Sequence, residues 1–204
     1  LKGNGPVFSA GGDIKMMLQD DPHLFEEVMD CISNIVLTLY TMPKVTISAL
    51  HGAAAGLGLS LALASDYVYA HPSTKIAMNF IKIGLIPDGA CHFFLKNRLG
   101  EIKAKHLIWE GKTMTGLEAS NIQLVDMVDE NVEVAILKEI ERLKSSPLQA
   151  MIETKLIYSN ESVEELKNIL YLEKDGQRKM RQTKDHQEGI RAFLGKRKPN
   201  FIGE

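Results

Sequence analysis

Cysteine and long apolar runs are scarce in this chain of 204 residues. The two cysteines, Cys31 and Cys91, lack the spacing of metal ligands, so we expect ordinary packing in a reducing compartment, the cytoplasm, and no metal site. No uninterrupted apolar stretch reaches the length of a membrane span, and the start of the chain does not resemble a signal peptide. These shortages exclude a membrane-spanning protein and a disulfide-stapled domain.

Neither positive nor negative charge predominates in the chain. Lysine and arginine total 24 against 26 aspartates and glutamates, which gives a net charge of -2. The chain as a whole is slightly acidic, and its C-terminal basic cluster is short, so nucleic acid is excluded as a partner. The length allows a sizeable core in one globular unit with a helical appendage.

Several glycines cluster in a segment that suits ligand binding. Residues 51–66 read HGAAAGLGLSLALASD, in which glycine-rich small residues run directly into an apolar helical segment. Small side chains let a ligand approach the backbone, and the first N–H groups of a helix have no partners within it. Such a turn stabilises an oxyanion or a phosphate. A tight packing interface between helices remains the alternative.

A second glycine turn strengthens the prediction of an active site. Residues 8–17 read FSAGGDIKMM, where Gly11 and Gly12 form a turn and Asp13 is placed to cap a helix starting at Ile14. Two turns of this kind allow two N–H groups to converge on one oxygen, which is what stabilisation of an enolate needs.

The remaining pattern alternates strands and helices before it becomes helical only. Strands are expected at residues 44–50, 67–70 and 75–78, with a helix at 57–65. An earlier helix, from Phe25 to a stop at Pro43, carries apolar residues that we interpret as core packing and not as a site. Helices are expected at 132–144, 148–159 and 161–183, the last two separated by Asn160. This order predicts stacked βαβ-type turns.

Four ordered motifs together resemble the enoyl-CoA hydratase/isomerase (crotonase) superfamily. They are FSAGGDIKMM, HGAAAGLGLSLALASD, KIGLIPDGACHFFLKNRLG and GIRAFLGKRKPNF, and they span the whole chain in order. The resemblance implies an α/β fold built as a spiral of ββα turns in residues 1–129, with a helical oligomerisation region in residues 130–204. It also implies opening strands before Leu1, so we expect an N-terminal portion to be missing.

The resemblance implies an acyl-CoA substrate whose thioester oxygen is held by the N–H groups of Gly12 and Leu57. Coenzyme A is then part of the substrate, and no separate cofactor is expected. In a family member of this kind the subunits form trimers or pairs of trimers, so a homotrimer or hexamer is expected. Further substrate contacts are implied for a set of residues in the same motifs: Ala10, Gly11, Asp13, Ile14, Gly56, Ser60, Phe80, Phe193 and Lys196. For Lys196, a solvated helix end is an equal alternative to a phosphate contact.

The chain departs from the family's hydratases at both water-activating glutamates. Ser60 and Phe80 occupy those positions, and neither side chain acts as a general base near neutral pH. Asp88, in the segment IPDG, matches the position from which several isomerases of the superfamily supply their catalytic carboxylate. Pro-Asp-Gly is also an ordinary turn sequence, so a purely structural Asp88 is the alternative.

One base that becomes an acid is enough to move a double bond, so the sequence favours an enoyl-CoA isomerase with Asp88 as its catalytic residue. Three alternatives stay open: hydration by an atypical site, hydrolysis or halide displacement with Asp88 as nucleophile, and a noncatalytic acyl-CoA-binding protein.

Overall fold

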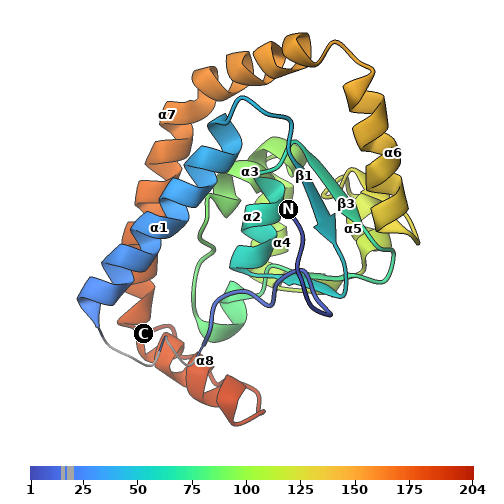
Figure 1. Ribbon diagram of the computed structural model, residues 1–204. Coiled ribbons are helices and arrows are strands. Elements are labelled where there is room, and N and C mark those ends of the chain that lie inside the picture. Colours follow the sequence, from blue (N-terminus) through green and yellow to red (C-terminus); the bar gives the residue numbers. More distant parts are fainter. Residues whose placement is uncertain (15–16, 18–20) are drawn as a thin grey trace.

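Short strands in two small sheets form the centre of the molecule (Figure 1). The structure is a computed structural model that describes residues 1–14, 17 and 21–204. One sheet has the order β1-β3-β6 and is parallel throughout; the other has the order β2-β4-β5, with β2 and β4 parallel and β5 antiparallel to β4. The strand bounds are β1 Ile47–Leu50, β2 Ala53–Ala55, β3 Tyr67–Ala70, β4 Lys75–Ala77, β5 Thr113–Met114 and β6 Met127–Val128.

Helices surround these sheets and account for most of the ordered chain. The bounds are α1 Pro22–Thr41, α2 Leu57–Leu63, the 3-10 turn η2 Phe80–Ile83, α3 Cys91–Leu99, α4 Glu101–Glu110, α5 Gly116–Asn121, α6 Val132–Lys144, α7 Leu148–Arg181 and α8 Lys184–Leu194.

The chain repeats one structural unit, which consists of a strand of the first sheet, a strand of the second sheet and then a helix. It runs β1, β2, α2 and then β3, β4, η2, with Ile47 opposite Tyr67 in one sheet and Ala53 opposite Lys75 in the other. A returning strand in the same sheet stays parallel because a helix carries the chain back. This arrangement is the spiral of ββα turns that the family resemblance implies, and the expected alternation of strands and helices is confirmed.

α1 begins at Pro22. Its N-cap is Asp21, whose Oδ1 accepts hydrogen bonds from the N–H groups of His23 and Leu24, and its end at Thr41 agrees with the predicted stop at Pro43. The helix expected to start at Ile14 falls mainly on residues 15, 16 and 18–20, which lie outside the described residues. Ile14 itself is in a turn.

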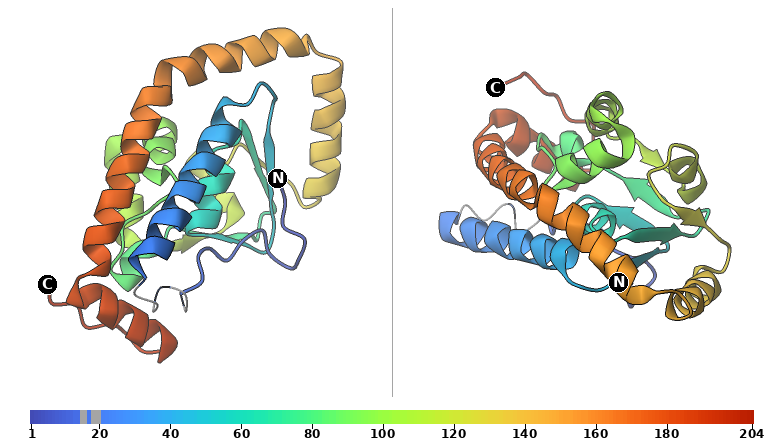
Figure 2. Two further views of the ribbon diagram at one scale, coloured as in Figure 1. Left: turned by 60° about the vertical axis from the view of Figure 1, so that its left-hand side comes forward. Right: turned by 90° about the horizontal axis from the view of Figure 1, so that it is seen from above.

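α7 is one continuous helix, so the predicted break at Asn160 is wrong. An asparagine in a helix interior costs only about 0.7 kcal/mol relative to alanine, and the apolar contacts of Leu166 and Leu170 outweigh it. The second half of α7 lies alongside α1, as both views in Figure 2 show, and Lys174 bonds Glu26 and Asp30 across that contact. Although α7 has 34 residues, none of the described helices is both long and apolar enough to cross a membrane.

Leu166 tests the packing of α7 on the core. Its side chain is fully buried, so Leu166→Ala should lower the free energy of unfolding by about 2–5 kcal/mol through lost contacts and a residual cavity. The measurement is urea unfolding at a fixed protein concentration. Leu117→Ala is the matched control, because Leu117 is 55% exposed and its truncation should change stability by no more than about 0.5 kcal/mol. Equal losses in both variants would contradict this packing.

Candidate active site

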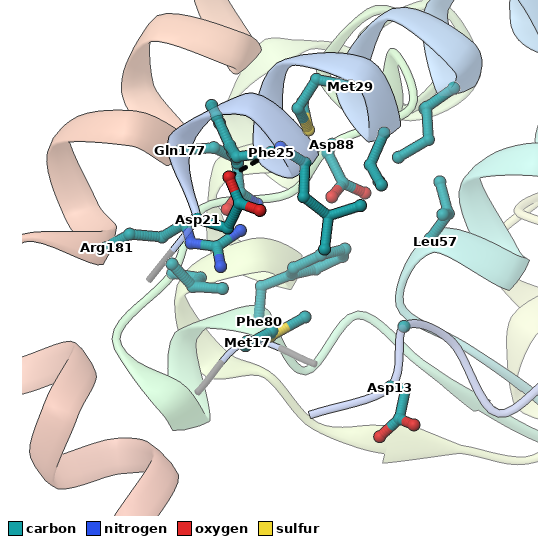
Figure 3. A pocket seen from close by; sticks show the side chains of 15 residues that line it. Asp13, Met17, Asp21, Phe25, Met29, Leu57, Phe80, Asp88, Gln177 and Arg181 are labelled. Carbon is teal, nitrogen blue, oxygen red and sulfur yellow. Dashed lines mark hydrogen bonds between the residues drawn. The ribbon is translucent and has the colours of Figure 1, made fainter. Parts of the chain in front are cut away.

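An apolar cavity of about 130 Å³ lies between α1, the start of α2, η2 and α7. One wall comes from α1, with Phe25, Met29 and Ile32. Another wall comes from Phe80 of η2 (Figure 3). The α1 residues were expected to serve core packing only, which is wrong: the same face that packs inward also lines the cavity. An apolar cavity that holds a few polar groups is typical of a small-molecule site.

The two glycine turns meet at one end of this cavity. Ser9 and Ala54 pair as an isolated bridge. The Ser9 N–H donates to the Ala53 carbonyl oxygen at 3.0 Å, and the Ala55 N–H donates to the Ser9 carbonyl oxygen at 3.0 Å. The approach is close, because a Cβ on Gly58 would lie 2.4 Å from the Ser9 side chain. Gly12 and Leu57 therefore line the same cavity although they are 45 positions apart in the chain.

Leu57 is the first residue of α2, where backbone N–H groups have no acceptor within the helix. A positive φ of 52° at Gly56 turns the chain into that helix. The predicted helix start beside the cavity is confirmed here.

Asp88 places a buried carboxyl group on the cavity wall. Asp88 is 8% exposed, and in the described part of the structure its Oδ1 has no hydrogen-bond partner. Burial, followed by the nearby negative charge of Glu173, raises the pKa of Asp88 to about 7. Figure 3 shows this side chain between Met29 of α1 and Phe80 of η2. A carboxyl group in this state can take up and release a proton near neutral pH.

The turn after Asp88 packs against the start of α2. Gly89 has a φ of 67°, and a Cβ there would lie 2.8 Å from Leu57 Cδ1 and 3.0 Å from Ser60 Cβ. The positive φ and this close approach to α2 both favour a glycine here. The contact brings the IPDG turn and the second glycine turn to one place.

α7 contributes two polar residues that the sequence analysis missed. Glu173 accepts hydrogen bonds from the N–H groups of Ala90 and His92, and Gln177 Nε2 donates to the Ile86 carbonyl at 2.5 Å. A sequence signal existed, since positions 166, 170, 173 and 177 follow the 4-3-4 spacing of a buried helix face. A glutamate and a glutamine on such a face indicate buried hydrogen bonding.

Comparison with known proteins agrees with this geometry. The sequence model described as enoyl-CoA hydratase/isomerase matches residues 1–204. The chain belongs to the enoyl-CoA hydratase/isomerase family. A Bacillus subtilis relative named as an enoyl-CoA hydratase/isomerase, YhaR, is 55% identical over 204 residues, which cover 98% of this chain and 80% of the relative.

Two further comparisons concern an isomerase and a solved structure of the family. The 1,2-epoxyphenylacetyl-CoA isomerase of Escherichia coli is 32% identical over 210 residues, covering 100% of this chain and 80% of that protein. The crystal structure of an enoyl-CoA hydratase from Mycobacterium avium subsp. paratuberculosis superposes with a TM-score of 0.87 at 32% identity, covering 98% of this chain and 78% of the other.

The structure brings together several of the residues that the family resemblance singled out. Five of them line the cavity: Gly12, Asp13, Leu57, Phe80 and Asp88. Four more belong to the two glycine turns: Ala10, Gly11, Ile14 and Gly56.

Three further expected substrate-binding residues lie outside both the cavity wall and the two glycine turns. Ser60 is fully buried one turn into α2, with its Oγ 3.5 Å from the Gly56 carbonyl oxygen. Phe193 near the end of α8 and Lys196 just after it are exposed, and neither belongs to the cavity wall in the described chain. Contacts of these three residues with a substrate stay predictions.

Proposed function

We propose that this enzyme moves the double bond of an enoyl-CoA, from the 3,4 to the 2,3 position, by proton transfer through Asp88. The observation that carries the proposal is the buried carboxyl of Asp88 in an apolar cavity, whose Oδ1 has no hydrogen-bond partner among the described residues and whose pKa is raised to about 7 by burial and by Glu173. Asp13 and Asp21 also line the cavity but are exposed, and the Asp13 carboxylate points away from it in Figure 3. Asp88 is therefore the carboxylate best suited to proton transfer.

The proposed reaction needs one base and two hydrogen-bond donors. Asp88 takes a proton from C2 of the 3-enoyl thioester, and the C–H electron pair forms a dienolate with its negative charge on the thioester oxygen. The N–H groups of Gly12 and Leu57 hold that oxygen, each contributing about 3–4 kcal/mol to lowering the barrier. The protonated Asp88 then returns the proton to C4, which leaves the 2-enoyl thioester and regenerates the carboxylate.

A noncatalytic acyl-CoA-binding protein is the second candidate, since it would keep the same fold and thioester contacts. The burial of Asp88 argues against it. A buried carboxyl oxygen without a hydrogen-bond partner, such as Asp88 Oδ1, destabilises the folded chain, and a protein that only binds acyl-CoA has no need of a carboxyl group facing the acyl chain.

Hydration of crotonyl-CoA should be poor or undetectable, because Ser60 and Phe80 stand where the family's hydratases have two glutamates. Phe80 is 7% exposed and its ring lies 3.6 Å from the Cβ position of Gly56, so it occupies space beside the thioester site. Purified protein is to be assayed in parallel with crotonyl-CoA and a trans-3-enoyl-CoA. The expected result is conversion of the 3-enoyl thioester alone. Efficient hydration that survives Asp88→Asn would favour an atypical hydratase.

Oligomerisation and location belong to the same proposal. Large apolar side chains of α6 and α7 are exposed in the single chain, among them Leu137, Ile157 and Tyr158. Exposed apolar groups on one helical region favour contacts between subunits, and we expect a homotrimer or a hexamer. The thiols of Cys31 and Cys91 are both free, in keeping with a cytoplasmic enzyme. No separate cofactor is proposed, since coenzyme A is part of the substrate.

A further inference from the structure

Glu173 is a buried carboxylate to which the proposed reaction gives no direct part. It is 2% exposed, and its Oε2 accepts a hydrogen bond from Ala90 N–H at 2.7 Å. Its Oε1 accepts from His92 N–H at 3.1 Å and lies 2.7 Å from His92 Nδ1. All of these partners belong to the segment that directly follows Asp88, so Glu173 fixes the backbone on the C-terminal side of the catalytic turn.

The conformation of that segment explains why it needs an external acceptor. Gly89 and Ala90 have φ values of 67° and 59°, and an alanine rarely adopts this left-handed conformation. Ala90 is also the N-cap of α3, but its side chain has no oxygen to accept from the first N–H groups of that helix. Glu173 supplies the missing acceptor from a helix far away in the sequence.

α7 also holds the turn on its N-terminal side. Gln177 Nε2 donates to the Ile86 carbonyl at 2.5 Å, one helical turn from Glu173. Gly176 lies against the same residue, because a Cβ there would lie 2.4 Å from Ile86 Cδ1, the flexible end of that side chain. Ile86, two residues before Asp88, and Ala90, two residues after it, are therefore both held by side chains of α7 that lie one helical turn apart.

We propose that Glu173 is a positioning residue of the isomerisation: by holding Ala90 and His92 it aims Asp88 into the cavity. Glu173 is absent from the cavity wall in the described structure, so it acts through Asp88 and not on the substrate. This inference rests on the proposed role of Asp88 as the base.

Charges around Asp88 support this role for Glu173. Apart from burial, the negative charge of Glu173 is what raises the pKa of Asp88. On α3, burial raises the pKa of the Cys91 thiol well above its usual range, so it stays neutral, while His92 faces Glu173. The other ionisable groups of the cavity wall come from different elements: Asp13, Asp21 and Arg181.

Glu173→Gln tests the inference, since it removes the charge and keeps the size of the side chain. With a trans-3-enoyl-CoA substrate, kcat should fall by about tenfold to a hundredfold with KM changed much less, because the base is misplaced. The acid limb of the kcat/KM pH profile should move to lower pH. The same shift should appear in the pKa of Asp88, followed in the free protein by NMR with ¹³C-labelled aspartate.

Glu165→Gln is the matched control. Glu165 also lies on α7 and also bonds α3, through Lys96 at 2.7 Å, but this pair is exposed and distant from the turn. It should leave kcat, the pH profile and the pKa of Asp88 as in the wild type. A Glu173→Gln variant that behaves like Glu165→Gln in these measurements would overturn the inference.

A second variant covers the case in which Glu173→Gln does not fold. His92→Ala removes one donor from the Glu173 carboxylate, so more of the negative charge faces Asp88 and the pKa of Asp88 should rise. If the pKa of Asp88 in His92→Ala equals that of the wild type, the inference is contradicted. The NMR titration needs no substrate. A shifted pKa of Asp88 in a protein that converts no 3-enoyl-CoA would overturn the proposed function and leave the electrostatic effect of Glu173 on Asp88 established.

Discussion

Asparagine at position 88 is expected to slow the conversion of a 3-enoyl-CoA to the 2-enoyl-CoA by about a hundredfold or more. The amide keeps the shape of the Asp88 side chain but cannot accept the proton from C2. Acyl-CoA affinity should change little, because the proposed thioester contacts come from the backbone of Gly12 and Leu57. The measurement compares kcat with acyl-CoA affinity in the wild type and the variant.

The wild type should show the protonation of Asp88 in its pH profile. Burial and the negative charge of Glu173 raise the pKa of Asp88 to about 7, and only the deprotonated form is a base. kcat/KM should therefore fall as pH decreases through about 7, and Asp88→Asn should lose this limb. Asp129→Asn is the control: Asp129 is an exposed turn residue that accepts from Asn131 N–H. Unchanged turnover in Asp88→Asn would return Asp88 to the role of a turn residue, and an inactive wild type would favour the noncatalytic binder.

Alanine at position 11 is expected to lower kcat by about a hundredfold to a thousandfold through the loss of one oxyanion donor. Gly11 has a φ of 92°, and a Cβ there would lie 2.9 Å from the Ala55 carbonyl oxygen. Both the backbone conformation and the contact push the first glycine turn away from β2. Gly12 N–H then loses its place opposite Leu57 N–H, whereas the base is untouched.

The Gly11→Ala measurement is best made well above pH 7, where Asp88 is deprotonated in both proteins. Gly5→Ala is the control in the same N-terminal segment, because a Cβ on Gly5 meets nothing within 4 Å. It should have wild-type kcat. If Gly11→Ala raised KM alone, or matched Gly5→Ala, Gly12 would not be a donor to the developing charge.

Local features of the chain were predictable and distant contacts were not. The strand-to-helix order around residues 44–78 depends on short-range patterns and is found where the sequence placed it, although strand β1 starts at Ile47. Asp88 could be proposed from a four-residue motif. Both results come from interactions between neighbours in the sequence, which pattern reasoning describes well.

Glu173 and Asn160 show where such reasoning fails. The hydrogen bond between Glu173 and Ala90 spans 83 positions, and no local pattern identifies which helix will cover a given turn. Asn160 looks like a boundary in isolation, but the packing of α7 against α1 decides the matter over its weak local preference.

The pairing of α1 with α7 also means that one part of the fold forms late during synthesis. α1 leaves the ribosome early, but its apolar face has no cover until α7, more than a hundred residues later, has been made. At roughly 5–20 residues per second this interval lasts several seconds. Throughout it Phe25 and Met29 face water or a chaperone, so the cavity is completed only when α7 folds back over α1.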